Sequence, residues 1–197
     1  KRTSKSFKAK EAGLGPIAVK LLTEQIEPSE ALAGFSHEDY ADLESQLDAI
    51  QHIIIDDWAQ NIALTTELKA TFAKTALLKS LVASEEKKEV GKKFRDYFDF
   101  SENLNKVPSH RLLAMLRGRQ ENVLGLKVDG QDDLPLARIE TEYDLESVQP
   151  QARQYYLKQT AKFFSLGKVR PAIEHSLLTK KRLAAETEAM DVFAENL

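Results

Sequence analysis

The clearest periodic signal is an apolar stripe between residues 40 and 58. Its members recur at alternating spacings of three and four residues, which places them on one face of a helix. Ser36 precedes the stripe, and Asp39 comes three residues after Ser36, a pattern typical of a helix N-cap. We therefore expect a long amphipathic helix that packs on a core, followed by a second helix over residues 62–74. The stripe consists of Tyr40, Leu43, Leu47, Ile50, Ile54 and Trp58.

A different period appears at residues 76–83 and 122–128. In the second of these segments Leu124, Leu126 and Val128 alternate with other residues, which is the period of a half-buried strand. Asp129 and Gly130 then supply a turn. The pattern predicts one small two-stranded β-ribbon in which residues 76–83 pair with residues 122–128.

The stretch between these two strands predicts two helices. Residues 85–98 have helical spacing, and residues 108–117 begin with proline in a first turn. A polar loop at residues 101–106 separates them. We expect a helix-turn-helix-like pair, although the loop is longer than the usual turn of about three or four residues.

Both ends of the chain also have helical patterns. Gly13 to Pro16 separate a basic segment from a short amphipathic helix, and residues 150–197 predict two helices broken near Gly167 and restarting at Pro171. The expected fold is mostly α, an irregular multi-helix domain. Its segments are a basic N-terminal arm and short helix at 1–35, a helical lobe with the helix-turn-helix-like module at 36–130, and connecting helices at 131–197.

Composition narrows the class of protein. The 197 residues are 42% hydrophobic and 30% charged, which is typical of a soluble protein rich in helix. Cysteine is absent, which excludes disulfides, thiolate metal sites and a cysteine nucleophile. No apolar run is long enough to cross a bilayer, and the start lacks a signal-peptide core. We expect a cytoplasmic protein. Because no initiator methionine is present and the end keeps helical spacing, we also expect an internal piece that leads to a further domain.

Charge is distributed unevenly, although the net charge is only -3. Residues 24–57 contain acidic side chains and no Lys or Arg, whereas residues 153–182 are strongly basic. A further basic cluster, formed by Lys1, Arg2, Lys5, Lys8 and Lys10, opens the chain. A polyanion is steered by local potential rather than by net charge, so the basic segments are candidate contacts for nucleic acid.

The segment 106–121 has the most informative chemistry. It predicts a short helix that ends with Arg117 and Arg119 on either side of Gly118, with His110 and Arg111 in its first turn. Arg117 is explained equally by capping of the helix C-terminus. Two guanidiniums beside a glycine can also hold a phosphate or a carboxylate, and of these two we favour a carboxylate of this same protein.

Two further basic segments combine cations with aromatic residues. At residues 92–100 the aromatic residues can stack on single-stranded nucleic acid. The helical spacing of Phe94 and Tyr97 favours the core instead, which leaves the neighbouring cations to contact phosphate. The helix after Pro150 has a basic face that suits nucleic acid, an acidic partner or, least well, an anionic membrane. The candidate phosphate contacts are Lys92, Lys93, Arg95, Arg111, Arg117, Arg119, Arg153, Lys158, Lys162, Lys168 and Arg170.

The sequence carries no catalytic or metal-binding motif. His37, His52, His110 and His175 are scattered, with no His-x-x-x-His or Glu-x-x-His spacing and no cysteine. We therefore expect no enzyme activity, no metal and no cofactor.

Two blocks resemble the Tex family of transcription accessory proteins. Residues 92–99 read K-K-F-R-D-Y-F-D and residues 106–123 read K-V-P-S-H-R-L-L-A-M-L-R-G-R-Q-E-N-V, close to the family's K-F-R-D-Y-F-D-Y and K-V-P-S-H-R-A-L-A-L-x-R-G-R-N-E-G-V-L. This chain departs from the pattern at Phe100, Leu112, Gln120 and Asn122. The resemblance extends to residues 1–14 and 189–197.

The resemblance implies an architecture and a role. Tex-like proteins continue into a ribonuclease H-like domain, helix-hairpin-helix modules and an OB-fold RNA-binding domain, and they have no established catalytic activity. The chain is similar to the part that holds a helix-turn-helix-like module and lacks the OB-fold. The resemblance implies a non-catalytic module that contacts nucleic acid, RNA or DNA, with help from other domains and from the transcription machinery.

Two hypotheses about function follow. In the first, the module contacts the phosphate backbone without sequence specificity. In the second, it is a structural scaffold or protein-interaction module whose arginines form internal ion pairs. The second predicts an exposed apolar strip on the last helix, along Ile173, Leu177, Leu183, Met190 and Phe193.

Overall fold

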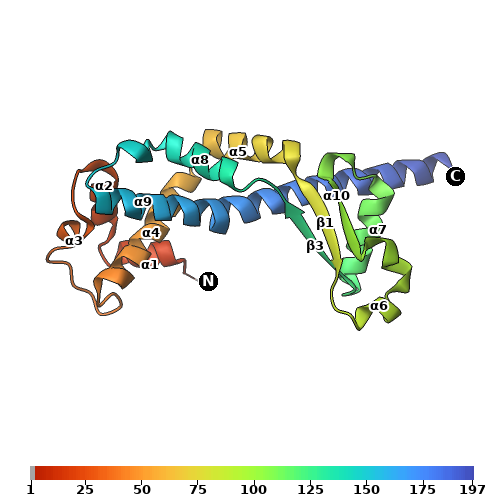
Figure 1. The fold of residues 1–197 in the computed structure, drawn as a ribbon, viewed down its shortest axis with the longest axis horizontal. Coiled ribbons are helices and arrows are strands. Elements are labelled where there is room, and N and C mark those ends of the chain that lie inside the picture. Colours follow the sequence, from red (N-terminus) through yellow and green to blue (C-terminus); the bar gives the residue numbers. More distant parts are fainter. Residues whose placement is uncertain (1–2) are drawn as a thin grey trace. The chain divides into compact units, whose positions relative to one another are not determined.

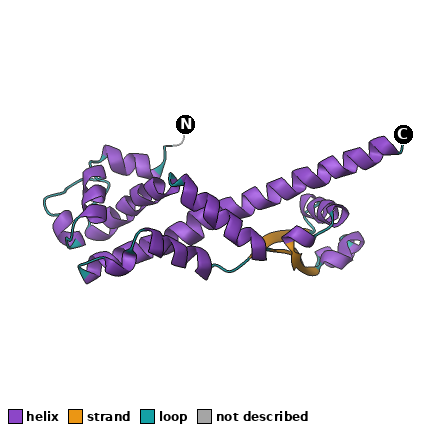
Figure 2. Cartoon of the chain, turned by 90° about the horizontal axis from the view of Figure 1, so that it is seen from above, coloured by secondary structure: helices purple, strands orange, loops and turns teal. Residues whose placement is uncertain are grey.

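The structure, a computed structural model, describes residues 3–197. Most of these residues are helical, and one small sheet interrupts the helices, so the expected mostly α fold is confirmed (Figure 2). The prediction of a basic arm falls partly on Lys1 and Arg2, which lie outside the described residues.

The chain forms two compact units, each built from two separate stretches. Unit 1 combines the residues up to Glu67 with Asp132–Val169, and unit 2 combines Leu68–Gln131 with Arg170–Leu197. The predicted segments 1–35, 36–130 and 131–197 do not coincide with these units. The reason is that stretches distant in sequence pack together within each unit, which local patterns do not reveal.

Unit 1 is helical throughout. It contains α1 (Lys5–Glu11), α2 (Gly15–Thr23), α3 (Pro28–Ala31), α4 (Leu43–Ala59), the first residues of α5 (Ile62–Thr75), α8 (Asp133–Glu142) and α9 (Gln151–Phe164). The ring of Trp58 on α4 is at its centre. It stacks on Tyr143 with ring centroids 4.4 Å apart and meets Phe164 edge to face at 5.8 Å. These aromatic contacts bury α4 against α9 and the end of α8.

The start of α4 differs from the prediction. The N-cap is Asp42, whose carboxylate accepts the backbone N–H of Ser45 at 2.7 Å, while the Ser45 hydroxyl accepts the N–H of Asp42 at 3.3 Å. This reciprocal capping box stabilises a start at Leu43, and the backbone hydrogen bond from Ser45 lowers the pKa of Asp42. The predicted N-cap at Ser36 is therefore wrong, because a turn bridged between His37 and Tyr40 comes first.

The apolar stripe of α4 is confirmed over its second half. Ile50, Ile54 and Trp58 are buried, whereas Leu43, in the first turn, is 43% exposed. Ile53 and Ile55 are also buried, so the apolar face is wider than the stripe of alternating three and four residues predicted.

Unit 2 is built on a three-stranded antiparallel sheet with the order β2-β1-β3. The strands are β1 (Leu77–Val82), β2 (Asp99–Asn103) and β3 (Leu124–Asp129). The predicted pairing of residues 76–83 with 122–128 is confirmed, since β1 lies beside β3 (Figure 1). Leu78 is opposite Val128, and both side chains are buried. Ser80 is buried on the same face as Leu78, and its hydroxyl donates to the Tyr97 carbonyl at 2.7 Å.

The third strand changes the predicted helix-turn-helix-like pair. Instead of one helix over residues 85–98, the chain forms α6 (Lys87–Val90) and a 3-10 helix at Lys92–Tyr97. The segment predicted as a polar loop instead contains most of β2 and a 3-10 turn at Leu104–Lys106. A strand therefore lies between the two helical segments. The segment forms a strand because its backbone pairs with β1, although its own sequence only weakly favours a strand.

Helix α7 (Ser109–Gln120) packs on both β3 and α10 (Arg170–Glu195) within unit 2. Ser109 donates its hydroxyl proton to Glu188 of α10. At the other end of α7, Gly118 is buried against Leu124 of β3. The predicted break near Gly167 takes the form of a π-helical turn, Ser165–Val169, after which α10 begins with Pro171 in its first turn.

The last helix presents apolar side chains to solvent. Ile173 is buried and Leu177 is half-buried, but Leu183, Met190 and Phe193 are 53%, 71% and 67% exposed. The strip predicted on α10 is therefore exposed only in its C-terminal part.

Gly118 provides a test of the close packing between α7 and β3. A Cβ atom at this position would lie 2.5 Å from Cδ1 and 2.8 Å from Cγ of Leu124. We expect Gly118→Ala to lower the free energy of unfolding by about 1–2 kcal/mol, although alanine favours helix by about 1 kcal/mol. Urea unfolding measures the change. Gly125→Ala is the control, because its Cβ meets only the Leu81 carbonyl at 4.0 Å. A Gly118→Ala variant as stable as the control would contradict the packing argument.

Candidate nucleic-acid interface

The cations of the 3-10 helix Lys92–Tyr97 lie at the surface of unit 2. Phe94 beneath them is buried, as expected for a core residue, while Tyr97 is half-buried. Lys92 binds Glu89 at 2.6 Å and Lys93 binds Glu121 at 2.7 Å, and all four side chains are at least 40% exposed. Such exposed pairs are weak and exchange readily for another anion. Arg95 is exposed and has no carboxylate within 4.0 Å among residues 3–197.

The first turn of α7 presents Arg111. Its guanidinium lies 3.6 Å from the Glu102 carboxylate of β2, and its side chain is 46% exposed. His110 beside it is also exposed. Arg111 is thus partly neutralised by the chain itself.

The last turn of α7 presents Arg117 and Arg119, and both side chains are exposed. Among residues 3–197, no carboxylate lies within 4.0 Å of either guanidinium. Gly118 between them is buried, so the backbone that carries the two arginines is held against β3. The structure therefore brings two uncompensated positive charges to one fixed turn. The partner favoured from the sequence, a carboxylate of the chain itself, is therefore wrong for these two residues within the described part of the chain.

Arg153 has a structural role and is removed from the candidate contacts. It is 6% exposed, and its guanidinium donates to the carbonyls of Leu21 at 2.6 Å, Leu22 at 3.0 Å and Gln149 at 3.0 Å. Two of these carbonyls belong to the last turn of α2, which has no further helical partner for them. Burial lowers the pKa of Arg153. The residue joins α9 to the end of α2 and cannot reach an external phosphate.

The other basic residues near α9 differ in their environment. Lys158 binds Glu146 at 2.7 Å, and this hydrogen bond raises the pKa of Lys158. Lys168 binds Asp56 of α4 at 2.6 Å. Lys162 is exposed and has no ion-pair partner within the described part of the chain. Only Lys162 therefore carries uncompensated charge in this group.

Arg170 belongs to a cluster at the end of β3. It donates to the Val128 carbonyl at 2.8 Å and to Asp129 at 3.4 Å, and its guanidinium lies 4.6 Å from the centre of the Phe72 ring. Its side chain is only 12% exposed, so Arg170 is a weak candidate for an external ligand. Lys79 binds the same Asp129 at 2.7 Å. The hydrogen bond from Lys79, followed by that from the Gly130 N–H, lowers the pKa of Asp129 to about 2.

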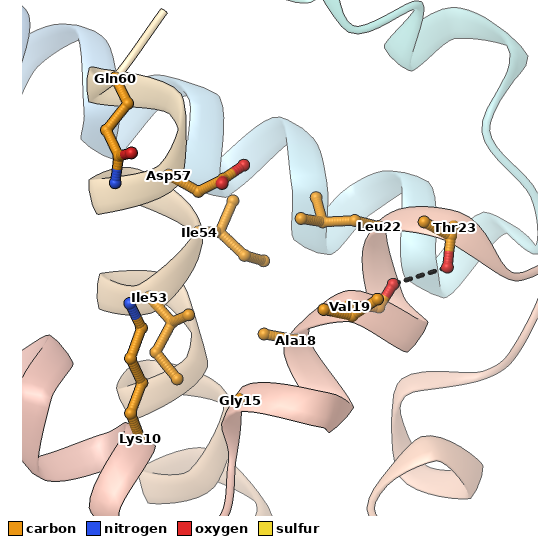
Figure 3. A pocket seen from close by; sticks show the side chains of 10 residues that line it. All are labelled: Lys10, Gly15, Ala18, Val19, Leu22, Thr23, Ile53, Ile54, Asp57 and Gln60. Atoms are coloured by element: carbon orange, nitrogen blue, oxygen red, sulfur yellow. Dashed lines mark hydrogen bonds between the residues drawn. The ribbon is translucent and has the colours of Figure 1, made fainter.

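Unit 1 has an apolar pocket of about 390 Å³ between α2 and α4, shown in Figure 3. Ala18, Val19, Leu22, Ile53 and Ile54 line it, with a few polar side chains among them. Among the lining residues the charges of Lys10 and Asp57 cancel, so the pocket offers no net positive charge to a phosphate. The pocket is therefore not part of the candidate interface.

The described residues meet the requirements of neither a metal site nor a membrane-spanning helix. Residues 3–197 hold no group of three or more His, Asp or Glu side chains placed to bind a metal ion. Burial, opposed by the charge of Asp48, lowers the pKa of His52, which lies beside the Phe163 ring. Among the same residues, no helix combines the length and apolar character needed to cross a lipid bilayer.

One arginine near the site was a sequence candidate only as part of the basic stretch 153–182, with no link to the α7 arginines. Arg182 of α10 lines the same cleft as Arg117 and Arg119 of α7. It stands at the end of the basic stretch 153–182, but no local pattern connects residues so far apart in sequence. Only the packing of α10 on α7 brings them together.

The structural role of Arg153 is directly testable. Arg153→Ala would leave three buried carbonyls without their charged donor, so we expect the free energy of unfolding to fall by about 3 kcal/mol. Thermal and urea unfolding measure the loss. Lys162→Ala, which removes an exposed cation of α9, should change stability by less than about 0.5 kcal/mol. Equal stability of the two variants would mean that Arg153 does not join α9 to α2.

The lowered pKa of Asp129 predicts a pH dependence of stability. A carboxylate whose folded pKa is depressed stabilises the fold above its unfolded pKa of about 4, and this contribution is lost as the pH falls toward about 2. We expect Asp129→Asn to cost about 1 kcal/mol at pH 7, with the difference from the original chain shrinking below about pH 4. Urea unfolding at several pH values tests this. Asp191→Asn, on the exposed end of α10, is the control and should show no such trend.

Comparisons with known proteins show which family the sequence resembles. A family model described as Tex central region-like matches residues 23–193. The whole chain is 35% identical to the transcriptional accessory protein Tex of Neisseria gonorrhoeae and covers 26% of that protein. It is also 35% identical to protein YhgF of Escherichia coli, covering 27% of it.

A third relative, protein tex of Bordetella pertussis, is 33% identical over the whole chain, which covers 26% of its length. The chain thus spans about a quarter of the curated relatives it matches. The family match covers most of the chain, including the α7 turn that presents Arg117 and Arg119. The chain therefore belongs to the Tex family, in which it corresponds to the central region.

Proposed function

We propose that the chain is a non-catalytic module that contacts the phosphate backbone of nucleic acid without sequence specificity. The observation that carries this proposal is the pair of exposed guanidiniums of Arg117 and Arg119, which have no carboxylate partner among residues 3–197. Arginine forks match phosphate oxygens, and a buried glycine keeps their backbone in place. Lys92, Lys93, Arg95 and Arg111 of the same unit add positive charge that weak surface pairs only partly neutralise.

The relatives' names support a role in transcription. One is called a transcriptional accessory protein, and we propose the same cellular process, in the cytoplasm, for this chain. Nucleic-acid contact by backbone charge requires neither a metal nor a catalytic residue. Since the chain spans about a quarter of its relatives, other parts of a longer protein and the transcription machinery are the proposed partners.

Salt dependence tests this proposal. Anisotropy titrations of fluorescent single- and double-stranded DNA and RNA should show binding that weakens steeply between about 50 and 200 mM salt. The double variant Arg117→Gln, Arg119→Gln should reduce the slope of log K against log salt by about 2 on duplex DNA. Lys158→Gln is the control, because its ammonium binds Glu146 and its side chain is only 31% exposed, and it should leave the slope unchanged. Absent binding at low salt, or a slope that the double variant does not alter, would contradict the proposal.

A second candidate function is that of a scaffold, and one observation favours it. Leu183, Met190 and Phe193 fall within one stripe of α10 and are all at least 53% exposed. Exposed apolar stripes of this kind mark protein interfaces. We propose another segment of a longer Tex-family protein as the partner. The two functions use different residues, so both can hold.

A further inference from the structure

Unit 2 has a polar cleft of about 730 Å³ between the C-terminal half of α7 and α10. Leu113 and Leu116 of α7 contribute its apolar lining, and the other residues around it are polar or charged. The cleft is large enough for a phosphate group and part of a nucleoside, since ligand pockets commonly range from about 300 to 1,000 Å³.

The charges around the cleft do not cancel. Arg117, Arg119 and Arg182 contribute three positive charges and Glu186 one negative charge, which leaves two positive charges. Arg182 and Glu186 are 3.9 Å apart, one turn of α10 from each other, and their side chains are 44% and 51% exposed. A pair so long and exposed holds its partners weakly.

The donors are held on an ordered backbone. After α7 ends, the N–H of Asn122 donates to the Arg119 carbonyl at 3.0 Å and the N–H of Val123 donates to the Gly118 carbonyl at 2.9 Å. Asn122 adopts a left-handed conformation, with φ of 58°, that closes this turn. The side-chain amides of Gln120 and Asn122 also line the cleft and supply neutral hydrogen-bond donors.

We infer that this cleft binds a phosphate monoester, either the terminal phosphate of a nucleic-acid strand or that of a free nucleotide. A monoester carries a charge of about -1.5 to -2 near neutral pH, which matches the two uncompensated charges, whereas a backbone diester carries only one. Three guanidiniums can surround the three terminal oxygens with paired hydrogen bonds. This inference rests on the proposed function. It assigns the surface around Arg117 and Arg119 a preferred ligand, the end of a strand rather than continuous backbone.

Glu186 has a defined part in this site. Its carboxylate competes with an incoming phosphate for Arg182, so it lowers affinity and favours a dianion over a weaker anion. Removal of its charge should strengthen binding, whereas removal of an arginine should weaken it. Both effects should be confined to the phosphorylated ligand, whereas general surface charge would change the binding of phosphorylated and unphosphorylated strands alike.

The experiment compares matched ligands on the same chain. Two single-stranded DNAs of about ten nucleotides, labelled at the 3′ end, carry either a 5′-phosphate or a 5′-hydroxyl, and the chain is titrated into each. In separate NMR titrations, AMP or adenosine is added to the chain. We expect the 5′-phosphate to bind about tenfold more tightly, and AMP but not adenosine to shift resonances of residues in the cleft. Arg182→Gln should abolish the preference, and Glu186→Gln should increase the affinity for the phosphorylated strand about threefold.

Arg95→Ala is the matched control from outside the cleft, and it should weaken both strands equally. Equal, salt-dependent binding of the two strands, with no response to AMP, would overturn the monoester site and leave the proposed function standing. A response to AMP in the cleft without binding of either strand would support the monoester site and contradict the proposed function. No response to any of the four ligands would overturn both.

Discussion

The structure depends on the close approach of Gly118 to Leu124, which lets α7 lie directly against β3. Because glycine has no Cβ, the last turn of α7 can be buried on one side while it presents arginine on the other. The same helix packs along α10, so both neighbours fix its orientation. The backbone that carries the two arginines is held in place by this packing. Because the backbone is already ordered, less entropy is lost when the side chains bind an anion.

Positive charge has two separate uses in this chain. Arg153 and Arg170 lie in well-shielded positions where backbone carbonyls accept their hydrogen bonds, so they hold elements together. Arg117 and Arg119 have no such partners among residues 3–197 and remain able to bind a ligand. The amino-acid type is the same in both groups. Burial and the available acceptors decide which arginine is structural.

The sequence predicted elements with strong local periodicity and missed those that depend on distant contacts. The apolar stripe around Ile50 and Ile54 predicted α4, and the alternation around Leu124 predicted β3, because both elements bury one face. Strand β2 was missed because Asp99–Asn103 is mostly polar and becomes a strand only by pairing with β1. The candidate site was half predicted: Arg117 and Arg119 stood out, but Arg182 joins them only through tertiary packing.

The most direct test of phosphate binding at the end of α7 follows the arginine side chains themselves. NMR spectra of the guanidinium Nε–H groups, recorded during titration with single-stranded DNA, would report each arginine separately. We expect the signals of Arg117 and Arg119 to shift along one common binding curve, while that of the buried Arg153 stays in place. Unchanged signals of Arg117 and Arg119 at saturating DNA would contradict the claim that this turn offers its charge to an external phosphate.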